Sequence, residues 1–267
     1  MLNFLQFINE RRISDVPIIS PETYISGMNK GSSDKLFFLN KINTNCIVDF
    51  GCADGSILRS IQSVDPTIKL IGYDIDDNML NRARSKSEDI EYYSNWGDVI
   101  ENIDPVNSTI MLSSVIHEVY SYNNSHEIIK FWSKVFNSSF KYVVIRDMMP
   151  SIKYEHFNLT DINKIREKSD PKYLEDFEKH WGNVGRDFRT LLHWLLKYTY
   201  TDNWSRELYE NYVPITIETL KKKIPTNWST IMEEHFIFQP LKDKVKRDFD
   251  FDLTEPTHIK MILRNVI

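Results

Sequence analysis

Runs of apolar residues and segments of helical periodicity alternate along the first 150 residues of the chain. Short apolar runs rich in β-branched residues are typical of strands that are buried on both faces. They occupy residues 46–50, 68–74, 90–94, 108–114 and 140–147. Apolar positions at helical spacing separate them, most clearly over residues 76–87 and 125–136. Strands that alternate with helices in this order predict a parallel α/β sheet.

The pattern changes in the second half of the chain. Residues 151–226 carry no clean strand, and an apolar helical stretch covers residues 191–198. Residues 230–239 and 258–263 alternate apolar and polar positions, which predicts an antiparallel pair that closes one edge of the sheet. The charged residues 242–247 between them are interpreted as a solvated loop.

These patterns predict an α/β fold with a seven-stranded sheet. The sheet is expected to be mostly parallel, with an antiparallel last pair, helices on both faces and a helical insertion. Four segments are expected in order: an N-terminal helical cap, a ligand-binding core, a helical insertion that acts as a substrate lid, and the last two strands. They cover residues 1–44, 45–150, 151–227 and 228–267.

A glycine turn follows the first predicted strand. Gly51 and Gly55 lie four residues apart, and a helix is expected to begin directly after them. A strand, a tight glycine turn and a helix together hold nucleotide-like ligands at the edge of parallel sheets. The acids Asp49 and Asp54 lie at this turn, where they would repel a pyrophosphate. They favour S-adenosylmethionine (SAM), which carries an ammonium and a sulfonium and no phosphate.

Residues 49–56, with the sequence DFGCADGS, resemble the first motif of the class I SAM-dependent methyltransferases. The resemblance covers about residues 45–150 and implies a Rossmann-like, SAM-binding core. It implies that Asp74 binds the ribose hydroxyls and that Ile75 lies against the adenine. Asp98 takes the place of the acid that binds the adenine amino group, and capping of the next turn is the alternative. The implied cofactor contacts are Asp49, Gly51, Cys52, Ala53, Gly55, Asp74, Ile75, Met79, Gly97, Asp98, Val99, Ser113 and Ser114.

Two further side chains near the expected cofactor site have simpler interpretations. Met79 either touches the adenine or fills the core. Lys35 lies beside an apolar helical face, so it is interpreted as a solvated lysine in preference to a partner of a ligand carboxylate.

Candidate catalytic residues follow the fourth and fifth strands, at the edge where the methyl group of SAM would face an acceptor. His117 is the candidate base, because histidine can take a proton near neutral pH; a hydrogen-bonded position under the cofactor is the alternative. Arg146, Asp147 and Tyr120 are candidates for orienting the acceptor, and an ion pair between Arg146 and Asp147 fits the sequence equally well. Glu118 is not expected to form a dyad with His117, because adjacent helical residues face different directions. Cysteine and histidine spacings predict no metal site.

Charge and composition restrict the partners and the location. The net charge of -5 gives no field that attracts nucleic acid, which disfavours duplex DNA and leaves a small molecule, a protein or RNA as acceptor. No apolar run approaches 18 residues, so no membrane span is expected. The two cysteines lie in or beside a buried strand, and the first residues lack signal-peptide order, which together predict a cytoplasmic protein. The oligomeric state is open.

Three functions are compatible with the sequence. The first is an enzyme that moves a methyl group from SAM to an oxygen or nitrogen acceptor. The second is a non-catalytic protein that has a methyltransferase fold and binds SAM or docks to a partner. The third is an NAD-dependent oxidoreductase, because an acid after the second strand serves the ribose of either cofactor.

Overall fold

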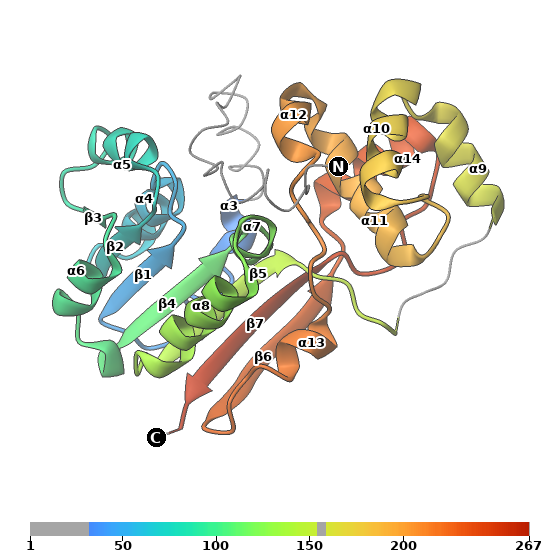
Figure 1. The fold of residues 1–267 in the computed structure, drawn as a ribbon. Helices are drawn as coiled ribbons and strands as arrows, with labels where there is room; N and C mark the ends of the chain where they lie inside the picture. The colour runs from blue at the N-terminus through green and yellow to red at the C-terminus, as the bar shows by residue number, and fades with distance from the viewer. Residues whose placement is uncertain (1–31, 154–158, 267) are drawn as a thin grey trace.

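The computed structural model describes residues 32–153 and 159–266 (Figure 1). A seven-stranded sheet forms its centre, in the order β3-β2-β1-β4-β5-β7-β6. Strands β1 to β5 are mutually parallel, and β7 runs antiparallel to its neighbours β5 and β6. The strands are β1 (Cys46–Phe50), β2 (Lys69–Tyr73), β3 (Glu91–Tyr93), β4 (Ser108–Ser113), β5 (Tyr142–Met148), β6 (Trp228–Phe236) and β7 (His258–Asn265). The predicted seven-stranded, mostly parallel sheet is confirmed.

Helices cover both faces of this sheet, because successive residues of a strand point to opposite sides. In β1, Ile47 shares an apolar cluster with residues of α4 (Ser56–Val64) and α5 (Asp77–Arg84). Val48 shares a second cluster with residues of α6 (Trp96–Glu101) and α8 (Ser125–Asn137). Side chains cap two of these helices: those of Asp76 and Asn124 each accept hydrogen bonds from two backbone N–H groups, at the starts of α5 and α8.

The sheet region also contains two short helices and a 3-10 turn. Helix α3 (Ser32–Lys35) opens the described part of the chain, so most of the predicted N-terminal cap, residues 1–31, lies outside the described residues. Helix α7 (Ile116–Tyr122) directly follows β4, and the 3-10 turn η2 (Pro105–Asn107) precedes that strand. No helix of the described residues is long and apolar enough to cross a membrane.

Helices make up the segment between β5 and β6. They are α9 (Leu159–Lys168), α10 (Pro171–Trp181), α11 (Phe188–Lys197), the 3-10 segment η3 (Tyr198–Asn203), α12 (Trp204–Glu207) and α13 (Ile217–Lys221). Most of their apolar side chains form a separate cluster, centred on α11. Helix α13 differs, because Ile217 and Leu220 pack into the apolar cluster of the sheet. The helical nature predicted for this segment is confirmed within the part that the structure describes.

The interpretation of residues 242–247 as a loop is wrong. These residues lie in α14 (Gln239–Phe249), which connects β6 to β7. Leu241, Val245 and Phe249 recur every four residues and are buried among the side chains of the insertion. The helix also explains why β6 ends at Phe236, three residues before the predicted end of that strand. Figure 1 shows α14 grouped with α9, α10 and α11 beyond the sheet.

Candidate functional site

A cavity of about 1330 Å³ lies at the carboxyl ends of the parallel strands. Its lining begins at the turn between β1 and α4 and continues past the ends of β2, β4 and β5 to the helical insertion and α14. The order of the strands changes direction between β1 and β4, and open α/β sheets bind ligands at such a point. The first half of the cavity lies beside the glycine turn and the ends of the parallel strands. The second half lies beside α7, the helical insertion and α14.

Position 51 of the glycine turn accommodates only glycine. Gly51 has a φ of 80°, and a Cβ atom there would lie 2.5 Å from Cγ2 of Val115. The N–H groups of Gly51 and Cys52 both donate to the carbonyl of Tyr73, at 2.8 and 3.1 Å. This places Gly51, Cys52 and Ala53 in the cavity wall. Gly55, with a φ of 71°, directly precedes α4 and packs against Tyr92, outside the lining.

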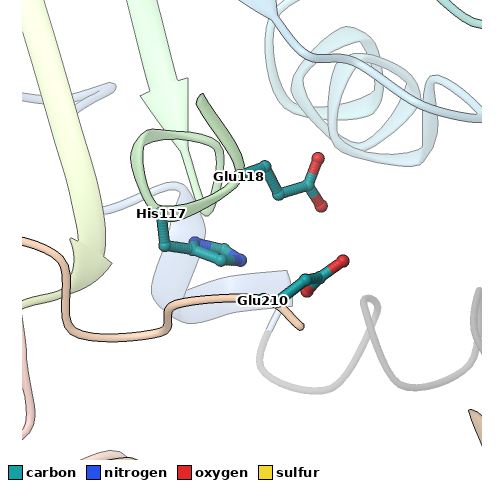
Figure 2. Close-up of side chains that lie close together, drawn as sticks. All are labelled: His117, Glu118 and Glu210. Atoms are coloured by element: carbon teal, nitrogen blue, oxygen red, sulfur yellow. The ribbon is translucent and has the colours of Figure 1, made fainter. Parts of the chain in front are cut away.

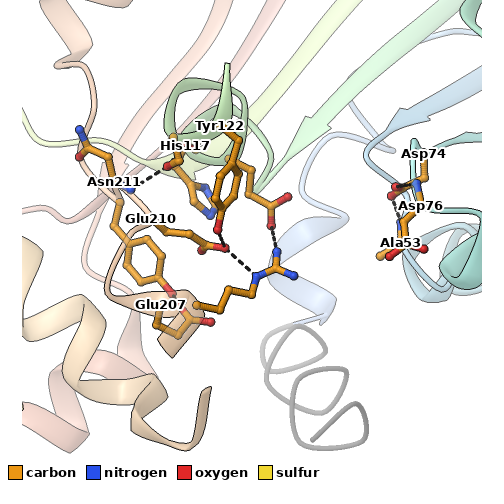
Figure 3. A network of polar contacts seen from close by, with 12 residues as sticks. Ala53, Asp74, Asp76, His117, Tyr122, Glu207, Glu210 and Asn211 are labelled. Atoms are coloured by element: carbon orange, nitrogen blue, oxygen red, sulfur yellow. Dashed lines mark hydrogen bonds and ion pairs between the residues drawn. The ribbon is translucent and has the colours of Figure 1, made fainter. Parts of the chain in front are cut away.

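Asp74 is fixed at the end of β2 by two backbone groups. Its Oδ2 accepts from the N–H of Ala53 at 2.8 Å, and its Oδ1 accepts from the N–H of Asp76 at 2.9 Å (Figure 3). Burial raises the pKa of Asp74 despite these two hydrogen bonds. Each carboxylate oxygen keeps a lone pair for a hydroxyl group of a ligand. Beside it, Ile75 is 79% exposed and lines the cavity together with Met79.

Asp49 lies beneath the glycine turn and is 1% exposed. Neither of its carboxylate oxygens has a hydrogen-bond partner within the described part of the chain. Burial raises the pKa of Asp49 to about 7, although the positive charge of Lys35 lowers it. Lys35 lines the cavity and is only 7% exposed, so its interpretation as a solvated lysine is wrong. Burial lowers the pKa of Lys35 to about 8.

Gly97, Asp98 and Val99 lie outside the cavity lining. Val99 is fully buried in the core, and Asp98 is exposed in the first turn of α6. The cap of this helix is Asn95, whose side chain accepts from the N–H of Gly97 at 2.7 Å. The adenine contacts implied for these three residues stay a prediction, and the alternative role of Asp98 as the cap is wrong.

His117 is fixed at the opposite side of the cavity by Asp147. Its Nδ1 lies 2.8 Å from Oδ1 of Asp147, whose Oδ2 accepts from the N–H of Ile116 at 2.7 Å. Burial opposes a charge on the imidazole. The carboxylate of Asp147 nevertheless raises the pKa of His117 to about 9, with help from Glu118 and Glu210. The predicted role of His117 as a base stays a prediction.

The predicted pairing of Arg146 with Asp147 is wrong. Arg146 instead donates to Asp34 at 3.1 Å and to the hydroxyl of Ser114 at 3.2 Å. It lines the cavity together with Ser113 and Ser114. The buried hydroxyl of Ser113 has no hydrogen-bond partner within the described part of the chain.

Tyr120 and Tyr122 belong to the same short helix and differ in their placement. Tyr120 lies outside the cavity lining, and its hydroxyl accepts a hydrogen bond from Nε1 of Trp132 at 3.0 Å. Tyr122 lines the cavity and donates a hydrogen bond to Glu210. Of the two tyrosines, the structure thus places Tyr122 at the site and Tyr120 in the supporting core.

The insertion contributes a group of buried charges that sequence reasoning missed. Glu207 and Glu210 both line the cavity, and Nε of Arg206 donates to Oε1 of Glu210 at 2.9 Å (Figure 3). Burial and the charge of Glu210 raise the pKa of Glu118 to about 7 and that of Glu207 to about 8. The only sequence signal for these acids is their spacing of three residues in a segment rich in aromatic residues. Tyr212 of that segment donates a hydrogen bond to Glu207.

Comparison with known proteins supports the same fold. No protein-family model matches the chain, and no curated protein matches it in sequence. The chain is similar in structure to the plantazolicin methyltransferase BamL, solved with a triazolic desmethylPZN analog and SAH. The TM-score is 0.52 at 12% identity, over 99% of this chain and 100% of that chain. A SAM-dependent methyltransferase from Archaeoglobus fulgidus gives 0.50 at 14% identity, over 89% and 94% of the two chains.

A third similar structure is a SAM-dependent methyltransferase from Anabaena variabilis ATCC 29413. It gives a TM-score of 0.51 at 12% identity and covers 94% of this chain and 97% of that chain. Together with the strand order, these matches show that the chain has the class I, Rossmann-like fold of SAM-dependent methyltransferases.

Proposed function

We propose that this protein is a SAM-dependent methyltransferase that transfers a methyl group to an oxygen or nitrogen atom. The observation that carries the proposal is the single cavity that joins the glycine turn and the fixed carboxylate of Asp74 to a polar second half. The first half fits an adenosine with a charged amino acid, and the second half provides space for an acceptor. The fold of the similar methyltransferases supports this assignment.

The cofactor would lie along the strand ends. Asp74 would accept hydrogen bonds from the ribose hydroxyls, and the exposed Ile75 would cover one face of the adenine. The methionine part would extend along Gly51 toward Ser113, whose hydroxyl lacks a partner within the described residues. The charges of Asp49, buried beneath the glycine turn, and of Lys35, in the cavity lining, lie near this position and would act on the ammonium and the carboxylate of the methionine part.

Methyl transfer is an in-line displacement, so the protein accelerates it mainly by fixing the distance and the angle between the reactants. In the second half of the cavity, the Asp147-bound His117, Glu118 and Tyr122 face the space next to the expected methyl group. We infer that these groups orient the acceptor, while residues of the insertion exclude water. Arg146 lies at the cofactor side of this space and holds Ser114.

Calorimetric titration of the full chain with SAM, SAH and NAD tests the cofactor. We expect one SAM per chain, and we expect Asp74→Ala to weaken SAM binding at least tenfold, about 1.4 kcal/mol. Asp89→Asn, an exposed acid on the surface, serves as the control and should bind SAM normally. Binding of NAD without binding of SAM would overturn the proposal in favour of an oxidoreductase.

Incubation with methyl-labelled SAM and cell extract tests the chemistry. We expect label in one of the RNA, protein or small-molecule fractions, and no label there with the Asp74→Ala variant. Tight SAM binding together with no transfer to any fraction would contradict the enzymatic assignment and leave a SAM-binding protein.

A further inference from the structure

Three potential metal ligands converge in the second half of the cavity. His117 and Glu118 come from α7, and Glu210 comes from the segment that follows α12. One ligand atom from each lies within 4.8 Å of the others. Figure 2 shows the imidazole and the two carboxylates pointing toward a common space. Ligand atoms of one octahedral ion lie about 3 to 4 Å apart when each bond measures about 2.1 Å, so a small closure brings this group to binding distance.

The orientation of His117 is a second, independent observation. The side chain is only 6% exposed, and its Nδ1 is bound to Asp147. Asp147 is held in turn by the N–H groups of Ile116 and Met148. The other ring nitrogen, Nε2, makes no hydrogen bond within the described part of the chain and lies on the side of the carboxylates. Metal-binding histidines are fixed in this way by a carboxylate on the nitrogen opposite the metal.

Hydrogen bonds also fix the carboxylate of Glu210 through one of its oxygens, and the other oxygen can bind a metal ion. Its Oε1 accepts hydrogen bonds from Tyr122 and Arg206. Its Oε2 has no hydrogen bond among the described residues, and the side chain lines the cavity. The guanidinium of Arg206 also lies 3.9 Å from Glu118. A cation therefore already lies beside both carboxylates in the ligand-free protein, which shows that their arrangement favours positive charge.

We propose that His117, Glu118 and Glu210 bind one divalent metal ion, and that this ion binds a hydroxyl group of the methyl acceptor. One imidazole and two carboxylates form a mixed nitrogen and oxygen set without sulfur, which suits Mn²⁺, Fe²⁺ or Zn²⁺ better than Mg²⁺ or Cu⁺. Three protein ligands leave coordination positions open toward the cavity. This inference rests on the proposed methyltransferase function and restricts its acceptor to compounds that present a hydroxyl oxygen.

The ion would supply the activation that the transfer needs. A metal-bound hydroxyl loses its proton to water more easily, because the ion stabilises the resulting oxyanion. A lone pair of that oxygen then forms the O–CH₃ bond while the S–CH₃ bond breaks. The electron pair of the broken bond stays on sulfur, so SAM leaves as neutral-sulfur S-adenosylhomocysteine and the acceptor leaves as a methyl ether.

Direct binding of Mn²⁺ to the full chain, first treated with a chelator, tests the inference without SAM. Electron paramagnetic resonance counts free Mn²⁺, and calorimetry gives the affinity. We expect one ion per chain. We expect Glu210→Gln, which keeps the side-chain volume, and His117→Ala to weaken binding at least tenfold. Two carboxylates outside the ligand set provide controls: Glu207→Gln is buried in the same cavity and Glu175→Gln is exposed on α10, and both should bind Mn²⁺ normally.

Arg206 gives a test in the opposite direction. If its guanidinium competes with the ion for Glu210, Arg206→Gln should tighten Mn²⁺ binding, whereas loss of a ligand weakens it. Circular dichroism of each variant establishes that it is folded. Absence of bound Mn²⁺, or equal affinity of the native chain and the Glu210→Gln variant, would overturn the metal site. SAM titrations of the same samples separate the two proposals: retained SAM binding without Mn²⁺ binding removes only the metal site, and lost SAM binding removes the methyltransferase assignment.

Discussion

Replacement of Asp49 by asparagine should stabilise the protein and weaken its cofactor binding. The carboxylate is 1% exposed and has no hydrogen-bond partner within the described residues. Burial raises its pKa from 3.8 to about 7, with a smaller increase from Asp74 and an opposing effect of Lys35. Under the proposed function, such a destabilising buried acid is expected where its charge serves the ligand, here the ammonium of SAM.

The magnitude follows from the two pKa values. In the unfolded chain the carboxyl loses its proton near pH 3.8, and in the folded protein it does so near pH 7. Between these values the unfolded state binds fewer protons, so the free energy of unfolding falls as the pH rises and then levels above pH 7. The full cost is about 4 kcal/mol at about 1.4 kcal/mol for each pKa unit. The part that falls between pH 5 and pH 8 is about 3 kcal/mol.

Asp49→Asn removes this titration. Its amide also lacks partners and removes one of the negative charges that stabilise the buried Lys35, which together offset about 2 kcal/mol of the gain. We therefore expect a net stabilisation of about 2 kcal/mol at pH 8. The pH-dependent part does not depend on that offset. The difference in unfolding free energy between the variant and the native protein should grow by about 3 kcal/mol from pH 5 to pH 8.

Urea denaturation at half-unit steps of pH measures this difference, and calorimetry measures SAM affinity at pH 8. The exposed Asp89→Asn variant is the control and should follow the native protein in both measurements. We expect SAM affinity to fall at least tenfold in Asp49→Asn, because the cofactor's ammonium loses its carboxylate. A stability difference that stays constant across the pH range would refute the reasoning about burial, and unchanged SAM affinity would refute the role in binding.

Two further predictions follow from backbone and side-chain placement. Gly51→Ala should lower the unfolding free energy by about 2 kcal/mol or more and abolish SAM binding. The reason is that φ is 80° and the new Cβ would lie 2.5 Å from Cγ2 of Val115. As a control in the same urea titration, Gly97→Ala in α6 should change the unfolding free energy by less than about 1 kcal/mol. Tyr120→Phe should cost about 1 kcal/mol through its hydrogen bond to Trp132 and leave the rate of label transfer from SAM unchanged. A large loss of transfer rate would return Tyr120 to the acceptor site.

The glycine turn and the acid at the end of β2 could be predicted from the sequence because local signals specify them. A buried strand, a glycine with positive φ and an acid at the end of the next strand are properties of short segments. Their positions in the sheet then follow from the topology of parallel strands. The adenine contact of Asp98 stays a prediction: Asp98 follows the third strand as expected, but it lies on an exposed helical turn outside the cavity lining.

One error at the acceptor side came from overlooked geometry. Adjacent residues of a strand point to opposite faces, so Arg146 and Asp147 of β5 cannot pair with each other. This correction uses only the predicted strand, so the sequence contained the information needed. On α7, residues four apart share a face, which places Tyr122 on the side of Glu118, and the role of Tyr120 stays a prediction.

The acceptor half differs because contacts between distant segments create it. Glu210 reaches Tyr122 across 88 positions of the chain. Helix α14 joins the insertion through three apolar residues, and the abundant charges around them hide that face in the sequence. No local pattern specifies such contacts, and buried acids such as Glu207 depend on partners that only the folded chain provides.

The difference between the two halves of the cavity limits what can be inferred from similar structures that share 12–14% sequence identity with this chain. The cofactor half depends on the backbone path of the strand ends, which the fold reproduces even where the side chains differ. The acceptor half depends on specific charged side chains from an insertion and from α14, and a similar backbone does not determine them. The identity of the proposed acceptor therefore has to come from the chemistry of His117, Glu118 and Glu210, and the proposed metal binding by these residues would restrict it most.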